Sequence, residues 1–166
     1  MSRIIQISDK GFNLIVGYEK IRLEAYPDGT GVPTIGIGMT RYPNGQKVKL
    51  GDTCSREQAL EWFKEELAVY EKYVDDLTRD DISQDEFDAL VDFCYNEGVG
   101  GLKSSTLLKT INTGNYSPEI ITPQFLVWDK EHVNGKLVEC EGLERRRRSE
   151  AHLLCTGELN FFEDAA

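Results

Sequence analysis

Residues 34–38 read Thr-Ile-Gly-Ile-Gly, and this short segment limits the possible folds of the chain more than any other. In an extended strand, Ile35 and Ile37 share one face, whereas Thr34 and the two glycines share the other. A face without side chains packs poorly unless a ligand or another part of the backbone approaches it closely. We therefore expect a short strand whose bare face is covered by a close neighbour.

Two turn signals flank this strand. Pro-Asp-Gly occupies residues 27–29, and Pro-Asn-Gly occupies residues 43–45. Both tripeptides favour tight turns. Residues 46–50 then suit a partner strand, so the pattern predicts a small antiparallel sheet within residues 26–50.

Helical patterns fill most of the remaining chain. Apolar residues at spacings of three and four predict a helix at 9–20 and a long amphipathic helix at 55–77. Capping boxes at residues 55–58 and 83–86 mark two helix starts, and the glycines at 98–101 are expected to end the second of these helices. Further helices are expected at 104–112, 124–131 and 142–155, with a proline-containing loop at 114–123.

These elements predict an α+β fold in a single domain of residues 1–166. Its N-terminal lobe covers about 9–54 and contains the sheet. The long helix at about 55–77 links this lobe to a helical C-terminal lobe at about 78–157. A chain of 166 residues with 40% hydrophobic and 29% charged residues has ordinary globular composition, so we expect a packed core rather than disorder.

The charge of the chain excludes several functions. A formal net charge of −10 disfavours nucleic-acid binding, which needs a basic surface, and gives no attraction to anionic membranes. No run of about 18 apolar residues is present to span a bilayer. Residues 1–17 lack the basic-then-apolar order of a signal peptide, because Asp9 and Lys10 interrupt them. We expect a protein made and folded in a cytoplasm.

Cysteine and histidine spacing predicts no metal site and no cofactor. The chain has four cysteines and two histidines, none of them in a CxxC pair or at zinc-ligand spacing. Reduced, partly buried thiols are the default for a cytosolic chain, although four cysteines allow three full disulfide pairings. The cysteines are Cys54, Cys94, Cys140 and Cys155, and the histidines are His132 and His152.

Two carboxylates flank the junction of the first helix and the sheet. Glu19 continues the apolar stripe of Ile15 and Val16, so its side chain is expected to face inward, where burial raises the pKa of a carboxyl. Asp28 lies in a wet, glycine-rich turn and stays ionised. Glycoside hydrolysis needs one carboxylic acid that protonates the leaving oxygen and one carboxylate that acts as base, nucleophile or charge stabiliser.

A plainer interpretation of the same pair stays open. The chain carries 29 acidic residues, most of which are expected on solvated faces, and an Asp before Gly is commonly turn chemistry alone. The residue pattern by itself therefore leaves Glu19 and Asp28 as candidates.

A resemblance to a known family supports Glu19 and Asp28 as catalytic residues. The stretch from Tyr18 to Asp28, followed by Gly-Val-Pro-Thr-Ile-Gly-Ile-Gly at 31–38, resembles the active-site segment of phage-type lysozymes, the endolysins of glycoside hydrolase family 24. The resemblance implies a lysozyme-like fold, with Glu19 as general acid and Asp28 as second carboxylate. It implies that Thr34 positions water or substrate.

The resemblance continues to the C-terminal part of the chain and covers residues 9–157. Four further segments match family motifs in the expected order: 84–98, 105–108, 125–128 and 142–150. It implies supporting or substrate-binding roles for Tyr26, Gly36, Asn96 and Arg146.

Arg146 belongs to a run of four arginines, 145–148, of which only one or two can face the same way on a helix. The run also fits a solvated helix face. The family register implies that Arg146 lies near Glu19. A nearby cation lowers the pKa of a carboxyl whereas burial raises it, so we hypothesise that Arg146 fixes Glu19 before substrate binds.

The chain departs from the family pattern at a few positions. Met39 replaces the His that many relatives carry after the last glycine of the strand motif, and Lys20 replaces the common Gly after the catalytic Glu. The strong negative charge is unusual for an enzyme that acts on an anionic envelope. These departures bear on salt and species preference.

The implied function is that of a muramidase, which hydrolyses the β-1,4 bond between N-acetylmuramic acid and N-acetylglucosamine in peptidoglycan and lyses the host. A lytic transglycosylase, which forms an anhydro product without water, is the close alternative. A non-catalytic wall-binding or structural module of the same fold is the other, because fold alone does not fix function.

The expected partner is the peptidoglycan glycan strand. We expect a monomer that binds no nucleic acid and does not insert into membranes. The family context implies that it waits in the host cytoplasm until a holin lets it reach the wall.

Overall fold

The computed structural model describes residues 3–163. The chain forms two compact units: the hairpin unit, Val16–Ala68, and the helical unit, made of the residues up to Ile15 and those from Val69 onward. The chain passes from one unit to the other within helix α1 (Asp9–Tyr18) and again within helix α2 (Arg56–Leu77). Helices together with two small antiparallel hairpins confirm the expected α+β class.

The hairpin unit is built on strands β1 (Arg22–Pro27) and β2 (Pro33–Gly36), which pair antiparallel. Tyr26 stands opposite Thr34, and Arg22 stands opposite Gly36. The expected partner strand at 46–50 is wrong, because those residues form a single isolated bridge, between Lys47 and Arg41. The nearer segment, joined to β2 by a short turn, pairs instead.

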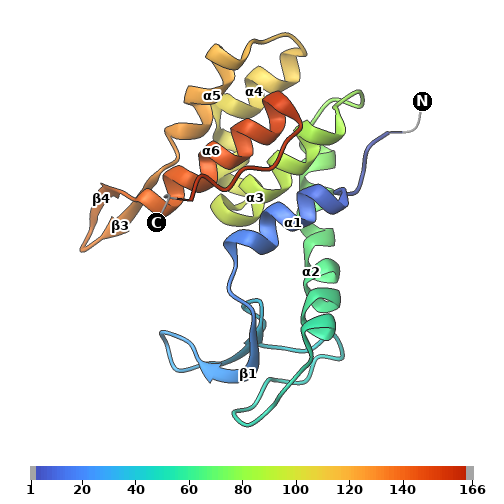
Figure 1. The fold of residues 1–166 in the computed structure, drawn as a ribbon, viewed down its shortest axis with the longest axis vertical. Coiled ribbons are helices and arrows are strands. Elements are labelled where there is room, and N and C mark those ends of the chain that lie inside the picture. The colour runs from blue at the N-terminus through green and yellow to red at the C-terminus, as the bar shows by residue number, and fades with distance from the viewer. Residues whose placement is uncertain (1–2, 164–166) are drawn as a thin grey trace. The chain divides into compact units, whose positions relative to one another are not determined.

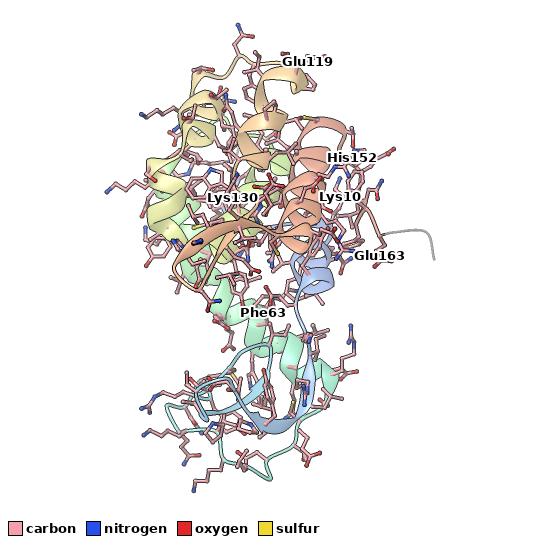
Figure 2. All side chains as sticks on the ribbon, turned by 90° about the vertical axis from the view of Figure 1, so that its left-hand side faces the viewer. Lys10, Phe63, Glu119, Lys130, His152 and Glu163 are labelled. Atoms are coloured by element: carbon pink, nitrogen blue, oxygen red, sulfur yellow. The ribbon has the colours of Figure 1, made fainter. Side chains whose placement is uncertain are left out.

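The bare face of β2 is covered by α2. A Cβ atom on Gly36 would lie 3.5 Å from Cβ of Ala59 and 3.9 Å from Cε3 of Trp62. The predicted close neighbour is therefore the first part of α2, but only at Gly36: β2 ends there, and a Cβ on Gly38 would meet nothing within 4 Å. Helix α2 begins with the predicted capping interaction between Ser55 and Gln58. Further along the same helix, Phe63 is almost fully buried (Figure 2).

The helical unit is centred on α3 (Gln84–Ser104). Helix α6 (Glu141–Thr156) packs against α3 and against α5 (Pro118–Leu126), as Figure 1 shows. Phe93 of α3 makes edge-to-face contacts with Phe125 and Trp128, at centroid distances of 6.2 and 5.4 Å. These aromatic contacts place an apolar core between α3 and the end of α5 together with the residues that follow it.

The start and the course of α3 differ in how well they were predicted. The capping box of Ser83 and Glu86 is present, which confirms the predicted start. The glycines do not end the helix: only Gly98 leaves the helical conformation, with φ 88° and ψ 158°, and the helix resumes to Ser104. Glycine tolerates this kink because it has no Cβ to clash at positive φ.

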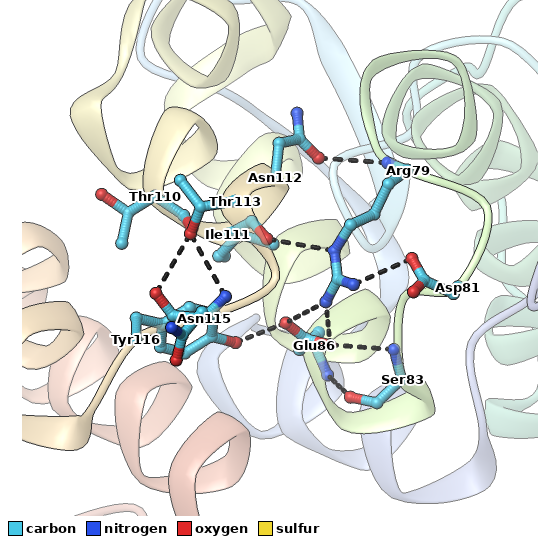
Figure 3. A network of polar contacts seen from close by, with 10 residues as sticks. All are labelled: Arg79, Asp81, Ser83, Glu86, Thr110, Ile111, Asn112, Thr113, Asn115 and Tyr116. Carbon is cyan, nitrogen blue, oxygen red and sulfur yellow. Dashed lines mark hydrogen bonds and ion pairs between the residues drawn. The ribbon is translucent and has the colours of Figure 1, made fainter.

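A polar network ties the start of α3 to α4 (Thr106–Thr113), as Figure 3 shows. The guanidinium of Arg79 donates to Asp81 at 2.8 Å and to the carbonyl of Ile111 at 3.2 Å. It also pairs with Glu86, which accepts a further hydrogen bond from the hydroxyl of Tyr116. The network fixes the ends of three helices relative to one another within this unit.

Two predictions for the stretch after α4 were wrong. Residues 118–126 form α5 instead of a loop, because Pro118 occupies its first turn, where a missing N–H costs nothing. The expected helix at 124–131 is also wrong, because α5 ends at Leu126. Strands β3 (Lys130–Val133) and β4 (Lys136–Glu139) form an exposed hairpin after it, with Lys130 labelled in Figure 2. Asn134 and Gly135 turn between them at φ 52° and 80°, as Asn-Gly hairpin turns do.

All four cysteines are free thiols. No helix within residues 3–163 is long and apolar enough to cross a membrane.

Candidate active site

Glu19 follows the end of α1 in the hairpin unit. Its backbone N–H donates to the carbonyl of Val16 at 3.2 Å, so the chain turns directly after the helix. The side chain is partly buried. Two effects raise the pKa of the Glu66 carboxyl on α2: partial burial is the larger, and the negative charge of Glu19 is the second. The Glu19 and Glu66 carboxylates therefore lie near each other.

Asp28 is held by the turn between β1 and β2. Its Oδ1 atom accepts hydrogen bonds from the backbone N–H of Thr30 at 2.8 Å, the hydroxyl of Thr30 at 2.7 Å and the backbone N–H of Val32 at 3.0 Å. The hydroxyl of Thr30 and these backbone donors lower the pKa of Asp28. The carboxylate is therefore ionised at neutral pH.

The second carboxylate oxygen of Asp28 has no such partner. None of the residues 3–163 donates a hydrogen bond to Oδ2. One oxygen of Asp28 thus fixes the turn, and the other is available to water or to a substrate.

Thr34 is connected to Asp28 through Val32. The Thr34 side chain is buried, and its hydroxyl donates to the carbonyl of Val32 at 2.9 Å. The same carbonyl accepts from the backbone N–H of Asp28 at 2.9 Å. The hydroxyl proton of Thr34 is therefore already used, and its oxygen keeps only acceptor capacity for a water molecule.

Tyr26 and Gly36 lie on the same hairpin. The guanidinium of Arg22 stacks over the Tyr26 ring, 4.4 Å from its centroid, so the ring is braced within β1. Gly36, at φ 64°, provides the close packing of β2 on α2. The structure thus gives both residues a role in holding the hairpin that carries Asp28 and Thr34.

The other two predicted site residues, Arg146 and Asn96, belong to the helical unit. Arg146 is 5% exposed and binds Asp92, with its Nη2 atom 2.7 Å from Oδ1. Burial acts to raise the pKa of Asp92, but the charge of Arg146 and its hydrogen bonds outweigh it, so the pKa is lowered. Asn96 accepts a hydrogen bond from Arg147 at 2.8 Å.

Sequence reasoning missed Arg147, which is fully buried. Its guanidinium donates to Glu97 at 2.5 Å, to Asn96 and to Glu150 at 2.8 Å. Burial raises the pKa of Glu150 well above its usual value, and the charge of Asp92 adds to this effect against the opposing charge of Arg147. A run of four arginines gave no signal that two of them would be buried against α3.

The chemistry open to the hairpin unit is that of a carboxyl pair. Asp28 supplies a fixed negative charge with one free oxygen, and Glu19 supplies a second, partly buried carboxyl. Glycoside hydrolysis uses such a pair as acid and as base, nucleophile or charge stabiliser. Residues 3–163 contain no group of three or more His, Cys, Asp or Glu side chains placed to hold a metal ion.

Comparisons with known proteins agree with this chemistry. The sequence profile described as phage lysozyme matches residues 16–150. The endolysin of Acyrthosiphon pisum secondary endosymbiont phage 1 is 35% identical over 149 residues, covering 90% of this chain and 97% of that protein. The endolysin of Salmonella phage P22 is 34% identical and covers 91% of this chain and 99% of its own length.

A solved structure supports the fold over nearly the whole chain. The endolysin from Escherichia coli O157:H7 phage FAHEc1 superposes with a TM-score of 0.85 at 34% identity, covering 96% of this chain and 99% of that one. The expected lysozyme-like fold is thereby confirmed. The chain belongs to the phage lysozyme family, the glycoside hydrolases that cleave bacterial peptidoglycan.

Proposed function

We propose that Glu19 and Asp28 are the two catalytic carboxyls, and that they hydrolyse the β-1,4 bond between N-acetylmuramic acid and N-acetylglucosamine. The observation that carries the proposal is the state of Asp28: ionised, fixed through Oδ1 and open at Oδ2. A stabiliser of positive charge must be ionised, held in place and reachable by the substrate, and Asp28 meets these three conditions. In this proposal, Oδ1 of Asp28 holds the turn and Oδ2 takes part in the reaction.

Glu19 acts as the general acid in this proposal. Its carboxyl gives a proton to the glycosidic oxygen as the C–O bond breaks, and the departing sugar leaves with a neutral hydroxyl. The emerging positive charge at the anomeric carbon is stabilised by the Asp28 carboxylate, at the free Oδ2 atom. Water then attacks the anomeric carbon and loses its proton to a carboxylate.

Thr34 is a positioning residue in this scheme. Through the shared Val32 carbonyl it holds the same turn that fixes Asp28, and its hydroxyl oxygen can still accept a hydrogen bond from the attacking water. Removing the hydroxyl is expected to disturb both the turn and the water.

Arg146 has its place in the proposal as a supporting residue. The pairing of Arg146 with Asp92 fixes its guanidinium on α3. That it acts on Glu19 stays a prediction, tested by the alkaline limb of the pH–rate profile, where a general acid loses its proton: Arg146→Ala is expected to move that limb, and an unmoved limb contradicts the role.

A lytic transglycosylase remains the second candidate, because it also needs a Glu as acid. The arrangement of Asp28 favours hydrolysis, since an intramolecular ring closure needs no second carboxylate and no positioned water. We further propose that the enzyme acts as a monomer and that, as the family context implies, a holin gives it access to the wall.

Clearing of peptidoglycan suspensions tests the catalytic assignment. Glu19→Gln keeps the size of the side chain but cannot donate the proton, so we expect a rate at least about 100-fold below wild type. Glu24→Gln, an exposed change on β1, is the matched control and is expected to clear at the wild-type rate. Equal clearing by wild type and Glu19→Gln rejects Glu19 as the acid.

A further inference from the structure

The dipeptide Asn-Gly occurs twice in the chain, at residues 44–45 and 134–135, and the two copies lie in different environments. Asparagine is a chemically labile residue, and a following glycine makes it more so, because a residue without a Cβ does not hinder attack of its backbone nitrogen on the asparagine side chain. The attack needs a glycine N–H that is free and an asparagine side chain that can turn toward it. Hydrogen bonds that hold either group therefore slow the reaction.

The first copy is held on both sides. The N–H of Gly45 donates to the carbonyl of Tyr42 at 2.9 Å. The side-chain oxygen of Asn44 accepts from the backbone N–H of Gln46 at 3.0 Å. The guanidinium of Arg41 donates to the carbonyl of Gly45 at 3.1 Å and braces the same turn. Both reacting groups are therefore occupied at this site.

The second copy is not held in this way. Asn134 and Gly135 form the turn between β3 and β4 at φ 52° and 80°. Within residues 3–163, no group forms a hydrogen bond with the Asn134 side chain or with the N–H of Gly135. The ladder of a two-residue hairpin uses the flanking residues instead, here Val133 and Lys136. The attacking nitrogen and the carbonyl that it attacks are both free.

The hairpin around the second copy is also easy to open. Every residue of β3 and β4 is exposed, and among the described residues each of these strands pairs only with the other. A two-stranded hairpin is marginally stable by itself, and exposed elements with few buried contacts open locally at low cost in free energy. Opening lets the Asn134 backbone leave its left-handed conformation and brings its side-chain carbonyl to the Gly135 nitrogen.

We propose that Asn134 is a site of spontaneous deamidation. The Gly135 nitrogen forms a bond to Cγ of Asn134, the C–N bond of the side-chain amide breaks, and ammonia leaves with the proton of the Gly135 N–H. Water then adds to one of the two carbonyls of the cyclic imide and opens it to aspartate or isoaspartate. The reaction uses neither Glu19 nor Asp28, so it is independent of the proposed catalysis.

The modification changes the hairpin in two ways. Either product adds a negative charge at the tip of the hairpin. Isoaspartate also carries the chain through its former side chain, so an additional carbon atom enters the turn. The turn sets the register in which Val133 pairs with Lys136, so the longer turn disrupts that pairing. We expect the hairpin to open in molecules with isoaspartate, while the α3–α6 interface stays intact.

Peptide mapping of the full-length protein after storage at mildly alkaline pH tests the site. Cleavage by trypsin after lysine and arginine releases residues 42–47 and residues 131–136 as separate peptides of one digest. Digestion in heavy-oxygen water marks any deamidation that occurs during the digest itself. In the folded protein we expect residues 131–136 to deamidate at least about fivefold faster than residues 42–47, the factor that corresponds to breaking one hydrogen bond first.

The same protein stored in urea is the matched control, because unfolding removes the hydrogen bonds at both turns. There the two peptides are expected to deamidate at similar rates. Equal rates in the folded protein, or a faster reaction at residues 42–47, overturn the proposal. An unchanged ratio in urea overturns it as well, because the difference would then come from the neighbouring sequence instead of the structure.

Hydrogen exchange measures the effect on the hairpin. The isoaspartate form, separated from wild type by ion exchange, is expected to lose protection within residues 130–139 and to keep it in α3 and α6. Equal protection of the hairpin in both forms contradicts the predicted opening. None of these measurements uses peptidoglycan, so failure of the catalytic assignment leaves their outcome unchanged.

Discussion

The α3–α6 interface of the helical unit and the β1–β2 hairpin both hold carboxylates in fixed positions, but with partners at different distances along the chain. At the interface, Arg146 reaches Asp92 across 54 residues, and Arg147 reaches Glu97 across 50. In the hairpin, every donor to Asp28 lies within four residues of it. The first arrangement exists only once the helices have packed, whereas the second is set by one turn.

The two regions also differ in what they leave unused. The interface carboxylates face arginines in a buried environment, where an unpaired charge would be costly. Asp28 keeps one oxygen without a protein partner and in reach of solvent. This contrast supports a structural role for the interface and the proposed catalytic role for the hairpin.

The largest effect is expected from breaking the buried ion pairs. Arg147→Ala leaves Glu97 and Glu150 without their cation, so we expect the free energy of unfolding to fall by about 3–5 kcal/mol. Arg148→Ala, on the exposed side of the same helix, is expected to cost less than about 1 kcal/mol. Urea unfolding of both variants measures the difference, and equal losses would remove the distinction between the two arginines.

The next largest effect is expected from Asp28→Asn, which should lower activity and leave the fold intact. Asp28→Asn keeps an oxygen that accepts from Thr30 and Val32 but removes the negative charge. We expect kcat to fall at least about 100-fold, with the urea unfolding midpoint at neutral pH close to that of wild type. A variant that unfolds more easily in proportion to its lost activity would mean that Asp28 only shapes the turn.

A smaller loss of stability is expected when the glycines of the strand motif are replaced. It distinguishes the cost of a positive φ from the cost of close packing on α2. Gly36 and Gly38 both have φ 64°, but an added Cβ meets Ala59 only at Gly36, and at the ordinary distance of 3.5 Å. We expect Gly36→Ala and Gly38→Ala to lose a similar 1–2 kcal/mol, roughly the cost of a left-handed conformation. A much larger loss at Gly36 would show that close packing on α2 dominates, which unfolding experiments on both variants measure.

The smallest effect is on the pH dependence of stability, and its sign differs between the regions. The pKa of Asp28 is lowered, so its contribution is present above the unfolded value of about 3.9 and is lost as the pH falls. The pKa of Glu150 is raised, so its contribution is full below about 4.3 and is lost as the pH rises through the folded value.

Unfolding midpoints across pH check both signs. Relative to wild type, Asp28→Asn should flatten the acid side of the profile. Glu150→Gln should reduce the loss of stability that occurs as the pH rises. A Glu150→Gln profile parallel to that of wild type would show that Glu150 is not protonated in the folded protein.

The same contrast explains what was predictable from sequence. The candidate site lies within residues 18–38, where turn chemistry, the bare strand face and the carboxyls are neighbours in the chain. Local rules therefore located Asp28 in its turn and Thr34 in its strand. The helix start at Ser83 was predicted for the same reason, because its capping partner Glu86 is three residues away.

The remaining features depend on contacts between distant segments or on a misinterpreted local signal. Burial of Arg147 follows from the packing of α6 on α3, and no pattern within residues 145–148 reveals it. The hairpin at Asn134 and Gly135 carried a local signal that was overlooked, and Pro118 was taken for a loop residue although it suits a first helical turn.

The most direct test of the central claim is mass spectrometry of the fragments released from purified peptidoglycan by wild type and by Glu19→Gln. Hydrolysis by the Glu19–Asp28 pair predicts fragments that end in a reducing N-acetylmuramic acid from wild type, and almost none from the variant. Fragments ending in the anhydro sugar would contradict hydrolysis, and equal release by both proteins would contradict the role of Glu19.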